Sequence, residues 1–66
     1  MPAKWTGDIV GIMHNYKITQ EDVALEMGVT KAYVSMILNG KKSPAGIKDR
    51  VEHAVNAIIL RRREEA

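Results

Sequence analysis

The middle of the chain constrains the fold most, because two short helical segments are separated there by a turn of only three residues. Thr19 is a favourable N-cap, and acidic residues fill the first turn that follows it. Gly28 suits the left-handed position that ends a helix, since glycine tolerates a positive φ. Thr30 is a second N-cap two residues later, and Asn39-Gly40 is a strong turn dipeptide. The pattern predicts helices over about 20–27 and 31–38.

Helical periodicity is present on both sides of this pair. Apolar residues recur at helical spacing from Trp5 to Tyr16, which predicts a helix over about 4–16. A second stripe runs from Ile47 to Ile58, and Ser43-Pro44 is interpreted as an N-cap followed by proline at the first helical position. This stripe predicts a long C-terminal helix over about 45–63. No strand pattern competes, so we expect an all-α, compact domain of four to five helices.

Length and composition limit what such a chain can be. With 66 residues the sequence predicts a single domain, 1–66. Cysteine is absent and only two histidines are present, so no disulfide, metal site or cofactor is expected. The longest apolar run, Ala57–Leu60, is far shorter than the ~20 residues of a membrane span, and the N-terminus lacks a signal-peptide pattern. We therefore expect a cytoplasmic protein.

Positive charge is concentrated in one part of the chain. The formal net charge is only +2, but residues 31–50 carry five basic residues and one acidic residue, which is 5 − 1 = +4. Such asymmetry fits a face that binds a polyanion. By charge alone, however, an ordinary solvated surface is the simpler interpretation.

The central pair of helices has the spacing of a helix-turn-helix, in which a glycine-containing turn joins two short helices. Ala24, four residues before Gly28, lets the second helix cross closely over the first. The segment Ile18–Gly40 resembles the helix-turn-helix of the lambda-repressor/Cro-like (XRE-type) family. The positions that carry the resemblance are Gln20, Ala24, Gly28, Val29, Val34, Ser35, Asn39 and Gly40.

The resemblance implies a sequence-specific DNA-binding regulator of bacterial or phage type, most simply a repressor. It implies that the helix over 31–38 enters the major groove of double-stranded DNA. If Val34 points to the core, Ala32, Met36 and Asn39 lie within about 40° of the opposite direction. N-terminal residues of a recognition helix usually meet base edges. The residues expected to face bases are Thr30, Lys31, Ala32, Ser35 and Met36.

Four of the base-facing residues have an expected contact. Lys31 can donate to guanine, Ala32 and Met36 can touch a thymine methyl group, and Ser35 can bind a base or a phosphate. Gln20 is assigned to a backbone phosphate by the resemblance, at the start of the helix over 20–27. The residues expected at phosphates are Gln20, Tyr33, Asn39, Lys41 and Lys42. For Tyr33, packing on a neighbouring helix is an equal alternative.

The expected reading face lacks glutamine, asparagine and arginine between positions 30 and 36, and these residues read adenine and guanine best. We therefore expect modest intrinsic specificity, increased by DNA shape or dimerisation. On a helical wheel centred on Val51, Ile59 lies at about 80° and Leu60 at about 180°. Both are candidates for a homodimer contact on a palindromic site. The alternative is that the last turn bends, or that Leu60 covers the first helix.

Two other classes of function were weighed. The same scaffold can serve as a protein-interaction module, such as an antitoxin-like or anti-repressor partner, but a large apolar patch on the helix over 31–38 would then be expected. That helix instead carries small residues beside Lys31, Lys41 and Lys42, which fits DNA better. An enzyme is the least expected class, since the chain shows no catalytic constellation and has little volume for a pocket. No small-molecule substrate is expected.

Overall fold

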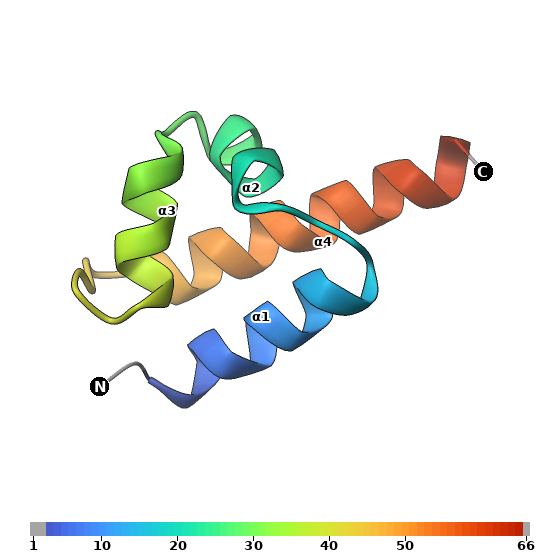
Figure 1. Cartoon of the computed structure of the whole chain (residues 1–66). Coiled ribbons are helices and arrows are strands. Elements are labelled where there is room, and N and C mark those ends of the chain that lie inside the picture. Colours follow the sequence, from blue (N-terminus) through green and yellow to red (C-terminus); the bar gives the residue numbers. More distant parts are fainter. Residues whose placement is uncertain (1–2, 66) are drawn as a thin grey trace.

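The computed structural model describes residues 3–65 and is built from four α-helices joined by short turns (Figure 1). They are α1 (Lys4–Asn15), α2 (Gln20–Met27), α3 (Lys31–Leu38) and α4 (Ile47–Glu65). The prediction of an all-α domain is confirmed. The helices α2 and α3 have the bounds that their capping residues predict, and α1 ends one residue earlier than expected.

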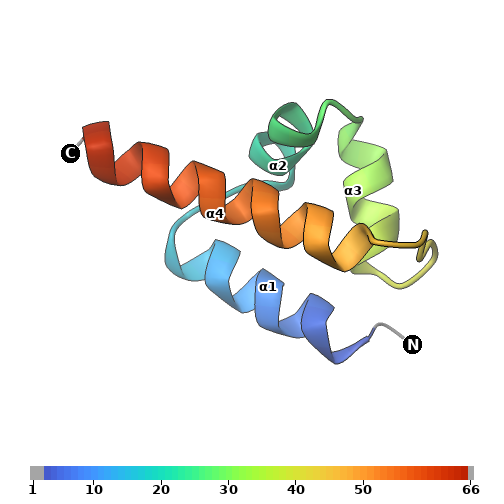
Figure 2. The ribbon, with the colours of Figure 1, turned by 180° about the vertical axis from the view of Figure 1, so that it is seen from behind.

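The long helix α4 packs against α1 and α2. Helix α2 packs against α3 and α4, and α1 also packs against α3 and α4. Viewed from behind, α4 lies across the molecule beside α1, and its C-terminal turns extend past the end of α1 (Figure 2). The central pair therefore packs against the outer two helices, α2 against α4 and α3 against α1.

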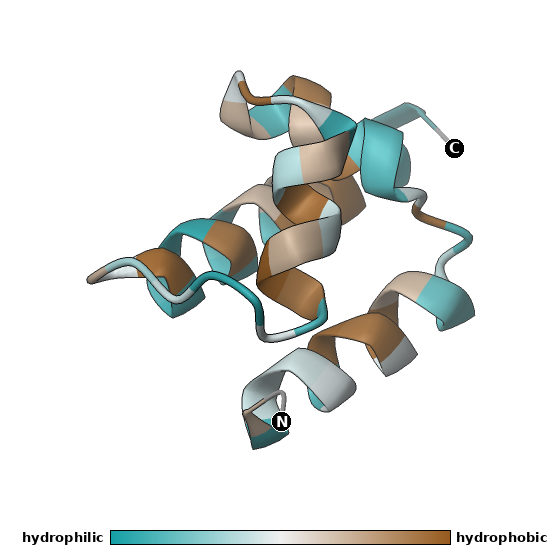
Figure 3. Ribbon diagram, turned by 60° about the vertical axis from the view of Figure 1, so that its left-hand side comes forward, coloured by the Kyte–Doolittle hydropathy of each residue, from teal (hydrophilic) through white to brown (hydrophobic). Residues whose placement is uncertain are grey.

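The core is aliphatic and draws on all four helices. Its fully buried side chains are four valines and one isoleucine, Val23, Val34, Ile37, Val51 and Val55. Apolar segments lie where the helices face one another, and the loop between α3 and α4 is largely hydrophilic (Figure 3). Trp5 is half-buried and packs against this core. Burial of this apolar surface stabilises the packed helices by about 25 cal/mol per Å².

Helix α2 is capped at both ends as the sequence predicts. The Thr19 side chain accepts a hydrogen bond from the Asp22 amide at 3.1 Å, and the Asp22 carboxylate accepts one from the Thr19 amide at 2.9 Å. This is a capping box. Gly28 ends the helix in the left-handed conformation with φ +72°. Thr30 caps α3 by accepting from the Tyr33 amide at 3.1 Å.

The end of α1 has a left-handed residue that was not predicted from the sequence. Lys17 adopts a left-handed conformation with φ +57°, at a position where glycine is usual. The Ile18 amide donates to the Met13 carbonyl at 2.8 Å and the Lys17 amide donates to the His14 carbonyl, which is a Schellman motif. Met13 and Ile18 are both buried in the core, and their burial compensates for the unfavourable backbone of Lys17.

The start of α4 differs from the prediction of a helix over about 45–63 with Pro44 at its first position. Gly46 has φ +74°, which is incompatible with a right-handed helix, and the Ile47 amide donates to the Pro44 carbonyl across a turn. Pro44 therefore opens a turn rather than the helix, and α4 begins at Ile47 and extends to Glu65. The Ser43 N-cap and the Pro44 N1 position were wrong.

Candidate nucleic-acid interface

Helix α3 is fixed in the fold by one face and leaves the other face outward. Val34, Ile37 and Leu38 are buried between the other helices. As a result, the N-terminal positions Thr30, Lys31 and Ala32 are exposed. Ser35 and Met36, which were also expected to face bases, are half-buried. The five residues thus lie along α3 and its cap, with the first three most accessible.

Ser35 and Asn39 lie one turn apart and are joined to each other. The Asn39 side-chain amide donates to the Ser35 hydroxyl at 3.2 Å. The link orients both polar groups at the C-terminal end of α3, where Asn39 is exposed.

The basic loop after α3 folds back onto that helix. The amides of Lys41 and Lys42 both donate to the Met36 carbonyl, at 2.8 and 3.3 Å, and both side chains are exposed. The Lys42 ammonium lies 5.8 Å from the centroid of the Tyr33 ring, within range of a cation–π interaction. Tyr33 itself is half-buried and packs against the core, in line with one of the two expectations for it, and its contact with a phosphate stays a prediction.

Gln20 is the first residue of α2 and is half-buried. The first four amides of a helix have no acceptor within the helix. The capping box satisfies two of them, since the Asp22 amide donates to the Thr19 hydroxyl and the Thr19 amide donates to the Asp22 carboxylate. Gln20 thus lies directly beside the capped N-terminus, where the helix dipole favours an anion.

Lys31 is accompanied by an acid. Its Nζ lies 3.8 Å from the Oε1 of Glu21, in the first turn of α2. The pair links the first turns of α2 and α3 and places a negative charge within the otherwise basic and polar surface.

The two expected dimer residues differ in their environments. Leu60 is 58% exposed, whereas Ile59 is half-buried and packs against the core, and a contact between copies through either residue stays a prediction. Leu60 borders a shallow groove between α1 and the C-terminal half of α4. The groove is lined by Ile12, Tyr16, Asn56, Ile59, Leu60 and Arg63.

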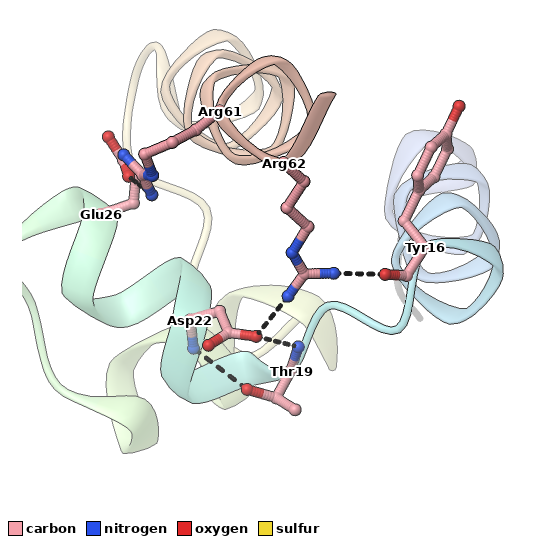
Figure 4. A network of polar contacts seen from close by, with 6 residues as sticks. All are labelled: Tyr16, Thr19, Asp22, Glu26, Arg61 and Arg62. Atoms are coloured by element: carbon pink, nitrogen blue, oxygen red, sulfur yellow. Dashed lines mark hydrogen bonds and ion pairs between the residues drawn. The ribbon is translucent and has the colours of Figure 1, made fainter. Parts of the chain in front are cut away.

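The arginines near the C-terminus of α4 bind acids of α2 in addition to complementing the dipole of α4. Arg61 pairs with Glu26 at 2.7 Å, and Arg62 pairs with Asp22 at 3.3 Å and donates to the Tyr16 carbonyl oxygen (Figure 4). Pairing with Glu26 raises the pKa of Arg61. The sequence did not predict that Asp22 and Glu26 pair with these arginines. The spacing of one turn between Asp22 and Glu26 could have indicated this pairing, because it places both carboxylates on one face of α2.

The comparisons with known proteins agree with this geometry. The helix-turn-helix family matches residues 15–47, which is half of the chain and covers α2, α3 and the basic loop. No curated protein and no solved structure matches the chain. Among residues 3–65, none of the helices has both the length and the apolar character needed to cross a membrane. The chain belongs to the lambda-repressor-like helix-turn-helix family of DNA-binding regulators.

Proposed function

We propose that this protein is a sequence-specific transcriptional regulator of bacterial or phage type that represses by occupying its operator. The observation that carries the proposal is the exposed N-terminal end of α3, where Thr30, Lys31 and Ala32 project from a helix anchored by buried residues on its other face. Small side chains beside a basic loop allow a helix to enter the major groove, which is about 12 Å wide.

The first residues of α3 read the bases in this proposal. Lys31 donates to guanine O6 or N7, and Ala32 contacts a thymine methyl group. Thr30 and Ser35 form hydrogen bonds to base edges, and Met36 adds an apolar contact deeper along the helix. The half-buried positions of Ser35 and Met36 make them secondary readers behind the three exposed residues.

Phosphate contacts flank the reading helix. Gln20 and the amides of the first turn of α2 bind one phosphate. The lysines of the loop bind the backbone at the other end of α3, with Lys42 steadied by the Tyr33 ring. Asn39 and the Tyr33 hydroxyl add neutral contacts there. Regulators of this kind need no cofactor, metal or catalytic group, and act in the cytoplasm, where bacterial DNA lies.

A second copy of the chain completes the operator complex. Half-sites one helical turn apart are separated by about 34 Å, and the longest dimension of this domain is 36 Å. Two copies can therefore occupy neighbouring half-sites and meet. Leu60, at the rim of the groove between α1 and α4, is the apolar side chain assigned to that contact.

Selection from a random-sequence duplex library, at low and at moderate salt, tests the proposal. A two-fold symmetric motif is expected, and Lys31→Ala and Met36→Ala are expected to change the selected sequence. Steeply salt-dependent binding with no motif would contradict sequence-specific reading. Absence of binding at low salt would overturn the DNA function and direct the search to a protein partner.

A further inference from the structure

Helix α2 is tied to the last turns of α4 by a pair of ionic contacts. Asp22 and Glu26 lie one turn apart on α2, and they meet the consecutive residues Arg62 and Arg61 of α4 (Figure 4). The two contacts are not equivalent. Arg61 binds one carboxylate, whereas Arg62 joins three segments of the chain.

Arg62 uses both ends of its guanidinium group. Nη2 donates to Asp22 Oδ2 at 3.3 Å, and Nη1 donates to the carbonyl oxygen of Tyr16, the residue that ends α1. The guanidinium is planar and its donors form a fixed fork. Holding two acceptors at once therefore fixes the end of α1 relative to the start of α2.

The atom that Arg62 binds on α2 belongs to the capping box. The same Asp22 Oδ2 accepts the hydrogen bond from the Thr19 amide at 2.9 Å. Between the two acceptors, the chain passes through Lys17 in its left-handed conformation. Arg62 thus stabilises the turn around Lys17, whose backbone conformation is unfavourable, at the end of the turn where α2 begins.

We propose that Arg62 is a positioning residue for DNA binding: it fixes the N-terminus of α2, and with it Gln20, at the place where a phosphate is bound. This inference rests on the proposed function. Arg62 acts through Asp22 and the turn, because it lies on the C-terminal turns of α4, which extend away from α3 (Figure 1). The network raises affinity for any duplex sequence, since a phosphate contact carries no base information.

A double-mutant cycle on binding to a random-sequence duplex pool at low salt tests the inference. Gln20→Ala alone is expected to weaken binding about fivefold, and Arg62→Ala about as much. In the Arg62→Ala background, Gln20→Ala is expected to have no further effect. Arg61→Ala is the matched control: it removes the same charge and a contact with α2 but leaves the capping box intact, so Gln20→Ala should retain its full effect there.

Arg62→Lys separates positioning from a direct phosphate contact, and it remains informative if Arg62→Ala does not fold. Lysine keeps the charge but lacks the fork, so we expect Arg62→Lys to weaken binding as Arg62→Ala does, with unchanged helix content by circular dichroism. Wild-type binding by Arg62→Lys, or additive effects of Arg62→Ala and Gln20→Ala, would overturn the inference alone. Failure of the wild-type protein to bind the pool would overturn the proposed function, and the inference with it.

Discussion

Lys31 Nζ lies 3.8 Å from Glu21 Oε1, so in the protein without DNA the basic residue at the start of α3 is paired with a carboxylate. The side chains are 61% and 71% exposed, and an exposed pair of this kind adds little to stability. The pair should instead affect the binding of DNA. The ammonium must leave Glu21 to reach a base, and the carboxylate repels approaching phosphates.

Glu21→Gln should therefore strengthen DNA binding by about two- to fivefold at low salt, because it releases Lys31 and removes the repulsion. The gain should shrink as salt rises, and the free energy of unfolding should change by no more than about 0.5 kcal/mol. Fluorescence anisotropy with a random-sequence duplex pool measures the first effect and urea unfolding the second.

Asp8→Asn is the matched control, because Asp8 is an exposed acid on α1. It removes the same charge away from Lys31 and should leave DNA affinity nearly unchanged. An equal gain in both variants would attribute the effect to net charge and contradict a role for the Glu21–Lys31 pair.

Gly28→Ala should destabilise the protein by about 1 kcal/mol. The φ of Gly28 is +72° and an added Cβ would meet no atom within 4 Å, so the loss comes from the backbone conformation alone. Gly7 is the opposite case, since it lies inside α1 with a helical backbone and open space around it. Gly7→Ala should stabilise by about 0.5–1 kcal/mol. Urea unfolding checks both signs, and a loss of stability in Gly7→Ala would contradict this account.

The sequence predicted the parts of the fold that depend on local chemistry. Thr19, Gly28 and Thr30 act on backbone groups within a few residues of themselves, so their types alone fix where α2 and α3 begin and end. The outward face of α3 was predicted in part for the same reason: with Val34 inward, helical geometry places Ala32 and Asn39 outward, and both are exposed, whereas Met36 is half-buried. The assignment of bases and phosphates to particular side chains remains a prediction.

The features that were not predicted are of two kinds, local turns whose residues are compatible with more than one conformation and contacts between distant segments. Pro44 is compatible with both a turn and a first helical position, and only the left-handed Gly46 decides between them. Lys17 adopts a positive φ in a Schellman motif flanked by the buried Met13 and Ile18, and a lysine side chain does not by itself indicate that conformation. The contact of Arg62 with Asp22 spans 40 positions of the sequence. Charge patterning showed both groups but not their pairing.

Asp22 should make stability depend on pH in the acid range. The Thr19 amide that donates to its carboxylate lowers the pKa of Asp22, and the charge of Arg62 adds to this lowering while partial burial opposes it. A carboxyl with a lowered pKa in the folded state stabilises that state above its ordinary pKa of 3.8, and the contribution is lost as the pH falls below it. The folded protein then holds a carboxylate that the unfolded chain has already protonated.

Asp22→Asn should accordingly be less stable than the wild-type protein at neutral pH, with the difference shrinking as the pH falls below about 4. Urea unfolding at a series of pH values measures this difference. A difference that is constant from neutral to acid pH would show that the charge of Asp22 does not contribute. Glu21→Gln serves as the comparison, because Glu21 lies beside Asp22 in the first turn of α2 but outside the capping box.

Leu60→Ser should weaken DNA binding by two copies of the protein and leave binding by a single copy unchanged. Leu60 is 58% exposed at the rim of the groove between α1 and α4, and burial of a leucine contributes about 1.5–3 kcal/mol. Its loss should reduce cooperative binding to a palindromic duplex about tenfold, while the affinity for a single half-site stays unchanged. Leu25→Ser is the matched control, because Leu25 is 83% exposed on α2, outside that groove. Sedimentation of the protein–duplex complex counts the copies bound. Equal loss of cooperativity in both variants, or none in Leu60→Ser, would exclude this groove as the contact between copies.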